Sequence, residues 1–134
     1  MRLNGHTRIL LVDDHDAFRR YVSSMLQERA NLQIIGEAGD GLQAVKQAKA
    51  LQPDVILLDI GLPGINGIEA ARQIGGVASE ARIVFLTQES SPEVIQEAFD
   101  LGAWAYIIKA QAGAELLPAV EAVSRGERFV NRTK

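Results

Sequence analysis

The feature that most constrains the fold is a short apolar run, residues 55–58, that ends abruptly in Asp59 and is followed by a loop rich in Gly and Pro. A continuous run of this length and composition is typical of a strand buried on both faces, in the middle of a parallel sheet. Ligands of open α/β sheets bind just outside the carboxyl ends of the strands. Asp59 is therefore placed either for chemistry or to cap the turn that follows, which is a common role of Asp.

Similar apolar runs recur along the chain and alternate with helical patterns. Strands are expected at residues 9–12, 32–38, 54–59, 82–86 and 104–108. Apolar residues at helical spacing predict helices at 16–29, 42–52, 66–76 and 92–101, with a last one around 116–123. Strict alternation of strand and helix predicts a doubly wound α/β domain, in which a parallel sheet carries helices on both faces through right-handed crossovers.

Local signals refine the ends of the later helices. Asn66 followed by Glu69 has the form of a capping box, and the helix that it opens is expected to end at Gly75 and Gly76. Ser91 is a candidate N-cap because a proline and then an acid follow it. Pro118 predicts that the regular part of the last helix starts late, since proline is tolerated only in the first turn.

Composition excludes several classes of protein. The chain has 134 residues, 47% of them hydrophobic and 23% charged, which is ordinary for one globular domain. A net charge of −3 gives no electrostatic footprint for nucleic acid, and the lack of cysteine excludes disulfides and thiolate metal sites. The polar N-terminus does not resemble a signal peptide, and no apolar run approaches the roughly 20 residues that cross a bilayer. We expect a cytoplasmic protein without a membrane partner.

Polar side chains gather where the predicted strands end. The first strand ends in Asp13 and Asp14, the third in Asp59, the fourth in Thr87 and the fifth in Lys109. Parallel strands bring these side chains to one edge, where three carboxylates repel one another unless a cation lies among them. Oxygen ligands favour Mg²⁺, which also binds phosphate oxygens. A carboxylate nucleophile, a metal, a lysine and a hydroxyl together suit in-line phosphoryl transfer.

The same residues carry a resemblance that covers about residues 7–125. The chain resembles a response-regulator receiver domain, the phosphoacceptor half of two-component signalling, through LVDD at 11–14, LLDI at 57–60, PGING at 63–67, FLT at 85–87, and GA at 102–103 with Tyr106 and Lys109 after it. Finer features resemble the NarL/FixJ type: DDH at 13–15 with FR at 18–19, GAELL at 113–117 and GERFV at 126–130. The resemblance implies a CheY-like, flavodoxin-like (βα)5 sheet in the strand order 2-1-3-4-5.

In that family a DNA-binding helix-turn-helix domain follows the receiver. The basic residues 126–134 are expected to be the start of a linker or a C-terminal tail, so the chain would be an excised or a stand-alone receiver. DNA would then be a partner only through an output domain that these residues do not include.

The resemblance also implies the roles of the acidic residues. Asp59 would accept a phosphoryl group from a sensor histidine kinase. Asp13 or Asp14, or both, would hold Mg²⁺ together with Asp59 and the backbone carbonyl of Gly61. The domain would be no enzyme beyond catalysing its own phosphorylation and dephosphorylation.

The resemblance further implies how phosphorylation would change the shape of the domain. Thr87 and Lys109 would bind the transferred phosphoryl group, and Tyr106 would swing inward as Thr87 moves. The face made by the helix at 92–101, the fifth strand and the last helix would then change shape. The expected output is homodimerisation or altered contact with an effector domain, since a local charge event can bias a two-state element.

Each assignment has a plain structural competitor. Asp13, Asp14 or Asp16 could cap the first helix, and Tyr106 could be ordinary core packing, which spacing alone favours. Thr87 could be a strand-end residue, and Lys109 a solvated edge charge. We interpret His15 as a loop residue near the site rather than a metal ligand, and Trp104 as a surface or partner-facing aromatic.

Three other classes of protein can be compared with the receiver. A haloacid-dehalogenase-like phosphatase needs a second Asp two residues after the nucleophile, where this chain has Gly61. A flavodoxin-like flavin site needs Ser, Thr and Gly after the first strand, whereas the acidic residues here would repel a phosphate. A pseudo-receiver that binds partners without phosphorylation remains the alternative, because Gln88 stands where the family usually has a small residue. The same Gln88 predicts slow entry of water and a long-lived phosphoryl state.

Overall fold

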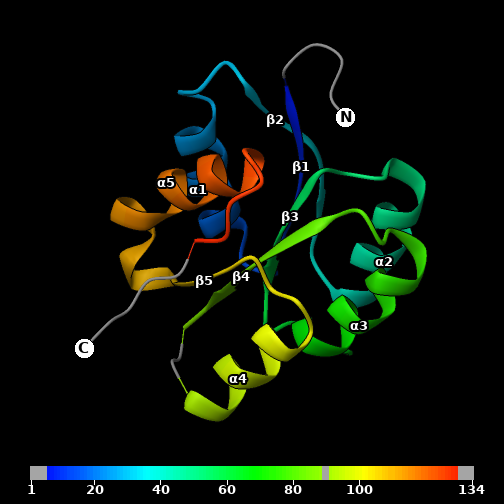
Figure 1. Ribbon diagram of the computed structural model, residues 1–134. Helices are drawn as coiled ribbons and strands as arrows, with labels where there is room; N and C mark the ends of the chain where they lie inside the picture. The colour runs from blue at the N-terminus through cyan, green and yellow to red at the C-terminus, as the bar shows by residue number, and fades with distance from the viewer. Residues whose placement is uncertain (1–5, 89–90, 130–134) are drawn as a thin grey trace.

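Five parallel strands form one sheet in the order β2-β1-β3-β4-β5 in the computed structural model, which describes residues 6–88 and 91–129 (Figure 1). The strands are β1 Thr7–Val12, β2 Leu32–Ala38, β3 Val55–Asp59, β4 Arg82–Thr87 and β5 Ala105–Ile108. The helices are α1 Asp16–Leu26, α2 Gly41–Leu51, α3 Gly67–Val77, α4 Pro92–Asp100 and α5 Ala112–Ser124, and a short 3-10 turn, η1 Lys109–Gln111, precedes α5. The predicted fold class and strand order are confirmed.

The helices form two layers around the sheet (Figure 1). Helices α1 and α5 cover one face, while α2, α3 and α4 cover the other. Every residue of β3 is buried, and its side chains alternate between the layers: Leu57 packs with the α1 and α5 side, and Ile56 and Leu58 pack with the other. Each such side chain contributes roughly 1.5–3 kcal/mol when fully buried. The central strand is thus held on both faces, as its apolar run predicts.

Helix α3 ends one residue after its two glycines. It runs through Gly75 and Gly76 to Val77, and both glycines lie in ordinary helical conformation with open space around the position of a Cβ. Glycine inside a helix costs only about 1 kcal/mol relative to alanine. Burial of Ile68 and Ile74 against the sheet outweighs that cost, so the helix ends at Val77, one residue after the predicted end.

Helix α5 begins six residues before Pro118, and the prediction of a late start was also wrong. Pro118 lies on the exposed face, and the residue four positions earlier, Ala114, is exposed as well. The carbonyl that loses its helical partner can therefore bond to water. Burial of Leu116 and Val120 on the opposite face holds the helix on the sheet.

The predicted caps are confirmed only in part. The Asn66 side chain accepts a hydrogen bond from the Glu69 N–H at 2.9 Å, as a capping residue does. The Glu69 carboxylate instead accepts from Arg72 at 2.7 Å. Ser91 occupies the N-cap position of α4 but makes no side-chain cap bond, because its hydroxyl donates to Glu93 Oε1 at 2.9 Å.

The segment after α5 packs against the start of β5. The Phe129 N–H donates to the Trp104 carbonyl at 2.9 Å. The guanidinium groups of Arg82 and Arg128 lie 4.6 and 4.4 Å from the centroid of the Trp104 ring. Trp104, expected at the surface or facing a partner, is therefore partly buried under two arginines of its own chain. Residues 126–129 of the predicted linker thus lie on the domain, and residues 130–134 are outside the described part of the chain.

Within the described residues, none of the helices combines the length and apolar character that a bilayer crossing requires.

Candidate functional site

The carboxyl edge of the sheet gathers the polar residues expected there. Asp13 follows β1, Asp59 is the last residue of β3, Thr87 is the last residue of β4, and Lys109 follows β5. The register aligns these ends, since Asp59 lies opposite Leu86 of β4 and Thr87 lies opposite Ile108 of β5. Parallel pairing therefore brings together four side chains that are far apart in the sequence.

Lys109 joins the two buried carboxylates. Its Nζ lies 2.6 Å from Asp13 Oδ2 and 3.4 Å from Asp59 Oδ2. Asp13 is fully buried and Asp59 is 3% exposed. Buried charges of like sign are costly unless a counter-charge lies between them. Lys109 supplies one positive charge for two negative ones, so the plain interpretation of this residue as a solvated edge charge does not hold.

The environment of Asp59, the acceptor candidate, disfavours its ionised form. Burial raises the pKa of Asp59 above its usual value of 3.8, and the charge of Asp13 raises it further. Lys109 and the Gly61 N–H, which donates to Asp59 Oδ1 at 3.1 Å, lower that pKa without cancelling the rise. A nearby cation would favour the ionised form of the Asp59 carboxylate. The electrostatics of this edge of the sheet therefore favour the binding of a cation.

The raised pKa of Asp59 gives a testable dependence of stability on pH. A carboxyl whose folded pKa is raised costs stability at neutral pH, and the cost disappears as the pH falls through the folded pKa. We expect Asp59→Asn to stabilise the metal-free protein at pH 7 by about 1 kcal/mol, and the difference from wild type to shrink toward pH 4. Urea unfolding in EDTA across this range measures both effects. A variant that is less stable than wild type at pH 7 would contradict the prediction.

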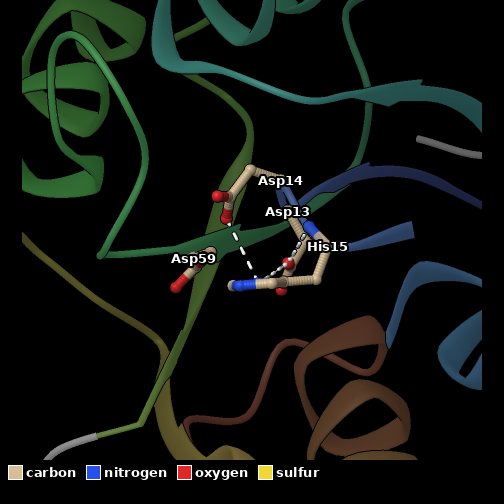
Figure 2. Close-up of side chains that lie close together, drawn as sticks. All are labelled: Asp13, Asp14, His15 and Asp59. Atoms are coloured by element: carbon tan, nitrogen blue, oxygen red, sulfur yellow. Dashed lines mark hydrogen bonds and ion pairs between the residues drawn. The ribbon is translucent and has the colours of Figure 1, made fainter. Parts of the chain in front are cut away.

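The donor set fits a divalent cation. Ligand atoms of Asp13, Asp14, His15 and Asp59 all lie within 4.8 Å of one another, and Figure 2 shows these side chains gathered at the ends of β1 and β3. Three of the four are carboxylates, which are the hard oxygen ligands that suit Mg²⁺. Asp14, at the mouth of the site, is more exposed than Asp13. The structure therefore supports both acids as candidate ligands, while the predicted role of the Gly61 carbonyl stays a prediction.

His15 lies at the site in the position expected of a loop residue. It is the N-cap residue of α1, and its Nδ1 is 3.1 Å from Asp13 Oδ1 and 3.3 Å from Asp14 Oδ1. The Asp13 carboxylate accepts from the His15 N–H at 2.8 Å. Asp16 is the first residue of α1 and pairs with Arg19, so it is not the helix cap.

Two residues of α1 that contact the site were not assigned from the sequence. The Arg19 guanidinium donates to the Asp13 carbonyl and lies 3.1 Å from Glu37 Oε1, so it ties β2 to the loop that carries the acids. The ring of Phe18 lies under Lys109, with Nζ 4.7 Å from its centroid. In the sequence both residues belong to the pattern of the helix and to the NarL/FixJ-type resemblance, but neither observation gives them a role at the site. Contacts with residues distant in the sequence leave no trace in local periodicity.

A cavity of about 210 Å³ opens beside Asp59. Its lining includes Asp59, Thr87, Gln88, Val94 and Tyr106. Thr87 is 6% exposed and Tyr106 9%, whereas Gln88 is exposed at the mouth. The structure thus places the predicted switch pair and the predicted modulating residue around one space, and Tyr106 is also part of the core.

An acidic pair, a buried aspartate and a lysine at the carboxyl edge of this sheet define a CheY-like receiver domain. The chain belongs to the response regulator receiver domain family, whose model matches residues 9–121. Its relatives are response regulators of the NarL/LuxR type. The predicted family is therefore confirmed.

Particular relatives show how much of a longer protein this chain matches. The transcriptional regulatory protein LiaR of Bacillus subtilis (strain 168) is 38% identical over 120 residues, which are 90% of this chain and 57% of LiaR. The response regulator UvrY of Escherichia coli (strain K12) is 33% identical over 122 residues, 91% of this chain and 56% of UvrY. The chain thus spans little more than half the length of these relatives.

Solved structures agree with this assignment. A two-component response regulator of the LuxR family from Aurantimonas sp. SI85-9A1 superposes with a TM-score of 0.88 at 34% identity, covering 94% of this chain and 89% of that one. The signal receiver domain of the putative response regulator NarL from Mycobacterium tuberculosis gives a TM-score of 0.85 at 30% identity, covering 91% and 98%.

Proposed function

We propose that this receiver accepts a phosphoryl group on Asp59 from the phosphohistidine of a sensor histidine kinase. The observation that carries the proposal is the pairing of Asp59, in a cavity, with a lysine that also contacts Asp13. A carboxylate nucleophile beside a fixed positive charge suits a reaction in which charge builds up on phosphoryl oxygens.

The transfer step balances with the residues at this edge. An oxygen of the Asp59 carboxylate bonds to phosphorus as the P–N bond of the phosphohistidine breaks, and the electron pair of that bond returns to the imidazole. The product is an acyl phosphate. Lys109 then pairs with a phosphoryl oxygen, and the Thr87 hydroxyl donates to another. A Mg²⁺ ion held by Asp13, Asp14 and Asp59 would supply additional positive charge for these oxygens.

The cavity supports a switch between the site and the α4, β5 and α5 face. A phosphoryl group adds negative charge and strong acceptor oxygens. Thr87 moves toward it, and Tyr106 fills the space that Thr87 leaves in the cavity they share. The output is a change in self-association or in contact with a DNA-binding output domain, as in longer response regulators.

The test is intact mass after incubation with acetyl phosphate, with and without Mg²⁺, beside an Asp59→Asn variant. We expect a gain of one phosphoryl group that needs Mg²⁺ and is absent from the variant. A folded wild-type protein that gains no mass would overturn the proposal in favour of a non-phosphorylated interaction module. A gain of one phosphoryl group in the Asp59→Asn variant would show that another residue is the acceptor.

Gln88 is expected to lengthen the life of the phosphoryl group. Its exposed side chain lies at the mouth of the cavity that contains Asp59, where it hinders the approach of the hydrolytic water. We expect Gln88→Ala to speed loss of the phosphoryl group by about threefold to tenfold, as for removal of a barrier of about 1 kcal/mol. The decay of phosphorylated protein after removal of acetyl phosphate measures it, and an unchanged rate would count against this role.

A further inference from the structure

Taking the proposed function as the starting point, we propose that Phe18 is a positioning residue for Lys109. Phe18 lies in the first turn of α1, and the Lys109 Nζ is 4.7 Å from the centroid of its ring. A cation within about 6 Å of an aromatic face is attracted by the negative potential of the ring. Phe18 touches no reacting atom, so its effect on the chemistry passes through Lys109.

The ring completes the surroundings of a buried ammonium group. The Lys109 side chain is 9% exposed, and an ammonium carries three N–H donors. Asp13 Oδ2 lies 2.6 Å from Nζ and Asp59 Oδ2 lies 3.4 Å away, while the ring lies against the same group. The ring face thus takes a place that water fills around an exposed lysine, and it restricts the ammonium to positions near the two carboxylates.

The ring itself is fixed by its neighbours. Phe18 packs against the core cluster on the α1 and α5 side of the sheet. Its centroid lies 6.0 Å from that of Tyr21, with the ring planes tilted by 49°. Because α1 begins directly after the loop that carries Asp13 and Asp14, the ring and the acids are held by one short segment. Lys109 therefore meets an aromatic surface with a defined position relative to the acceptor.

This arrangement suits the movement that phosphorylation requires of Lys109. The ammonium must turn from the Asp59 carboxylate toward a phosphoryl oxygen on the same side chain. A ring face is attractive over a wide area and makes no directional bond, so the ammonium can turn without losing this contact. A leucine at position 18 would fill part of the space without the attraction, and the ammonium would spend less time in the productive position.

The test replaces Phe18 in the full chain by 4-fluorophenylalanine, by 3,4,5-trifluorophenylalanine and by leucine. Fluorine weakens the negative face of the ring with little change in size. We expect the rate of phosphorylation by acetyl phosphate at saturating Mg²⁺ to fall stepwise along this series, reaching a threefold to tenfold loss with leucine. The affinity for beryllofluoride should fall in the same order. Phe129→Leu serves as the matched control, because it removes a ring of the same core cluster beside Trp104, at the other end of β5 from Lys109. It should change the rate less than twofold.

A purely structural role of Phe18 gives a different pattern. The fluorinated variants would then match wild type, and only leucine would be slow, which would overturn the proposal. The contact has a readout that does not depend on phosphorylation: the Lys109 Hε protons should resonate upfield of those of the exposed Lys46 and Lys49, through the ring current of Phe18. If wild type gains no phosphoryl group but this shift is present, the proposed function fails and the contact stands. If the shift is absent, the contact itself is refuted.

Discussion

Replacing Gly67 with alanine is expected to destabilise the protein by about 3 kcal/mol, the upper part of the usual range for overpacking. Gly67 is the first residue of α3, and a Cβ there would lie 2.2 Å from the Asp59 carbonyl oxygen and 2.7 Å from the Ile60 Cα. Both contacts are with backbone, which cannot turn away as a flexible side chain can. The start of the helix and the end of β3 must therefore move apart.

The same substitution is expected to damage the site. The Gly67 N–H donates to the Ile60 carbonyl at 2.8 Å, so the helix start is bonded to the residue that follows Asp59. A shift of this contact displaces Asp59 from Lys109. Misplacement of a reacting group by about 1 Å can cost about 100-fold in rate, and we expect phosphorylation by acetyl phosphate to fall about tenfold to 100-fold under conditions where the variant is folded.

Two other glycines of the same helix serve as controls. A Cβ on Gly75 or Gly76 would meet nothing within 4 Å. Alanine there is expected to raise the free energy of unfolding by up to about 1 kcal/mol, because alanine favours the helix, and to leave the phosphorylation rate unchanged. Urea unfolding and intact mass are the measurements. A Gly67→Ala variant as stable as the Gly75→Ala variant would show that the backbone adapts to the new methyl group.

Much of this site could be predicted because strand polarity determines it. Apolar runs that end in Asp13, Asp59 and Thr87 must be buried, and a parallel sheet leaves their carboxyl ends at one edge. Lys109 belongs to the same edge for the same reason. The residue types then suggest the chemistry. These inferences need only the order and direction of the strands.

Contacts that depend on side-chain placement could not be predicted in this way. Phe18 has the spacing of a core residue, and nothing in α1 alone indicates that its ring meets Lys109, which comes from the other end of the chain. Gly67 occupies an ordinary helical position, so its close approach to Asp59 is visible only in three dimensions. Pro118 is tolerated within α5 because it lies on the solvent-exposed face of the helix. Local helix propensity does not indicate which face of a helix will be exposed.

Replacing Lys109 with methionine is expected to give the largest combined loss of stability and reactivity. The change leaves Asp13 and Asp59 buried side by side without their cation. Removing one partner of a buried ionic group costs about 3–5 kcal/mol, and we expect a loss of about 3 kcal/mol at pH 7 in EDTA. Lys49→Met on the exposed face of α2 removes the same charge at the surface and should change stability by less than about 0.5 kcal/mol.

The pH dependence of the Lys109 variant separates lost charge from lost packing. Burial and Asp13 already raise the pKa of Asp59, and Lys109 opposes them. Without the lysine that pKa rises further, so the native variant takes up a proton at higher pH than wild type. Its deficit in stability should therefore be largest at neutral pH and shrink as the pH falls through the raised pKa. A deficit that stays constant from pH 7 to pH 4 would indicate lost packing instead.

Added Mg²⁺ and the phosphorylation rate complete the test of Lys109. A cation that binds the folded state stabilises it by an amount that grows with the logarithm of the cation concentration relative to its Kd. Mg²⁺ should stabilise the methionine variant more than wild type, because the carboxylates have lost their lysine and bind the cation more tightly. Phosphorylation by acetyl phosphate should still fall about 100-fold to 1000-fold, since a charge stabiliser of the phosphoryl oxygens is missing.

Lys109→Arg keeps the charge but changes its shape, so it should recover most of the stability and little of the rate. Full recovery of the rate by arginine would show that positive charge alone, without the placement of the ammonium group, serves the transfer.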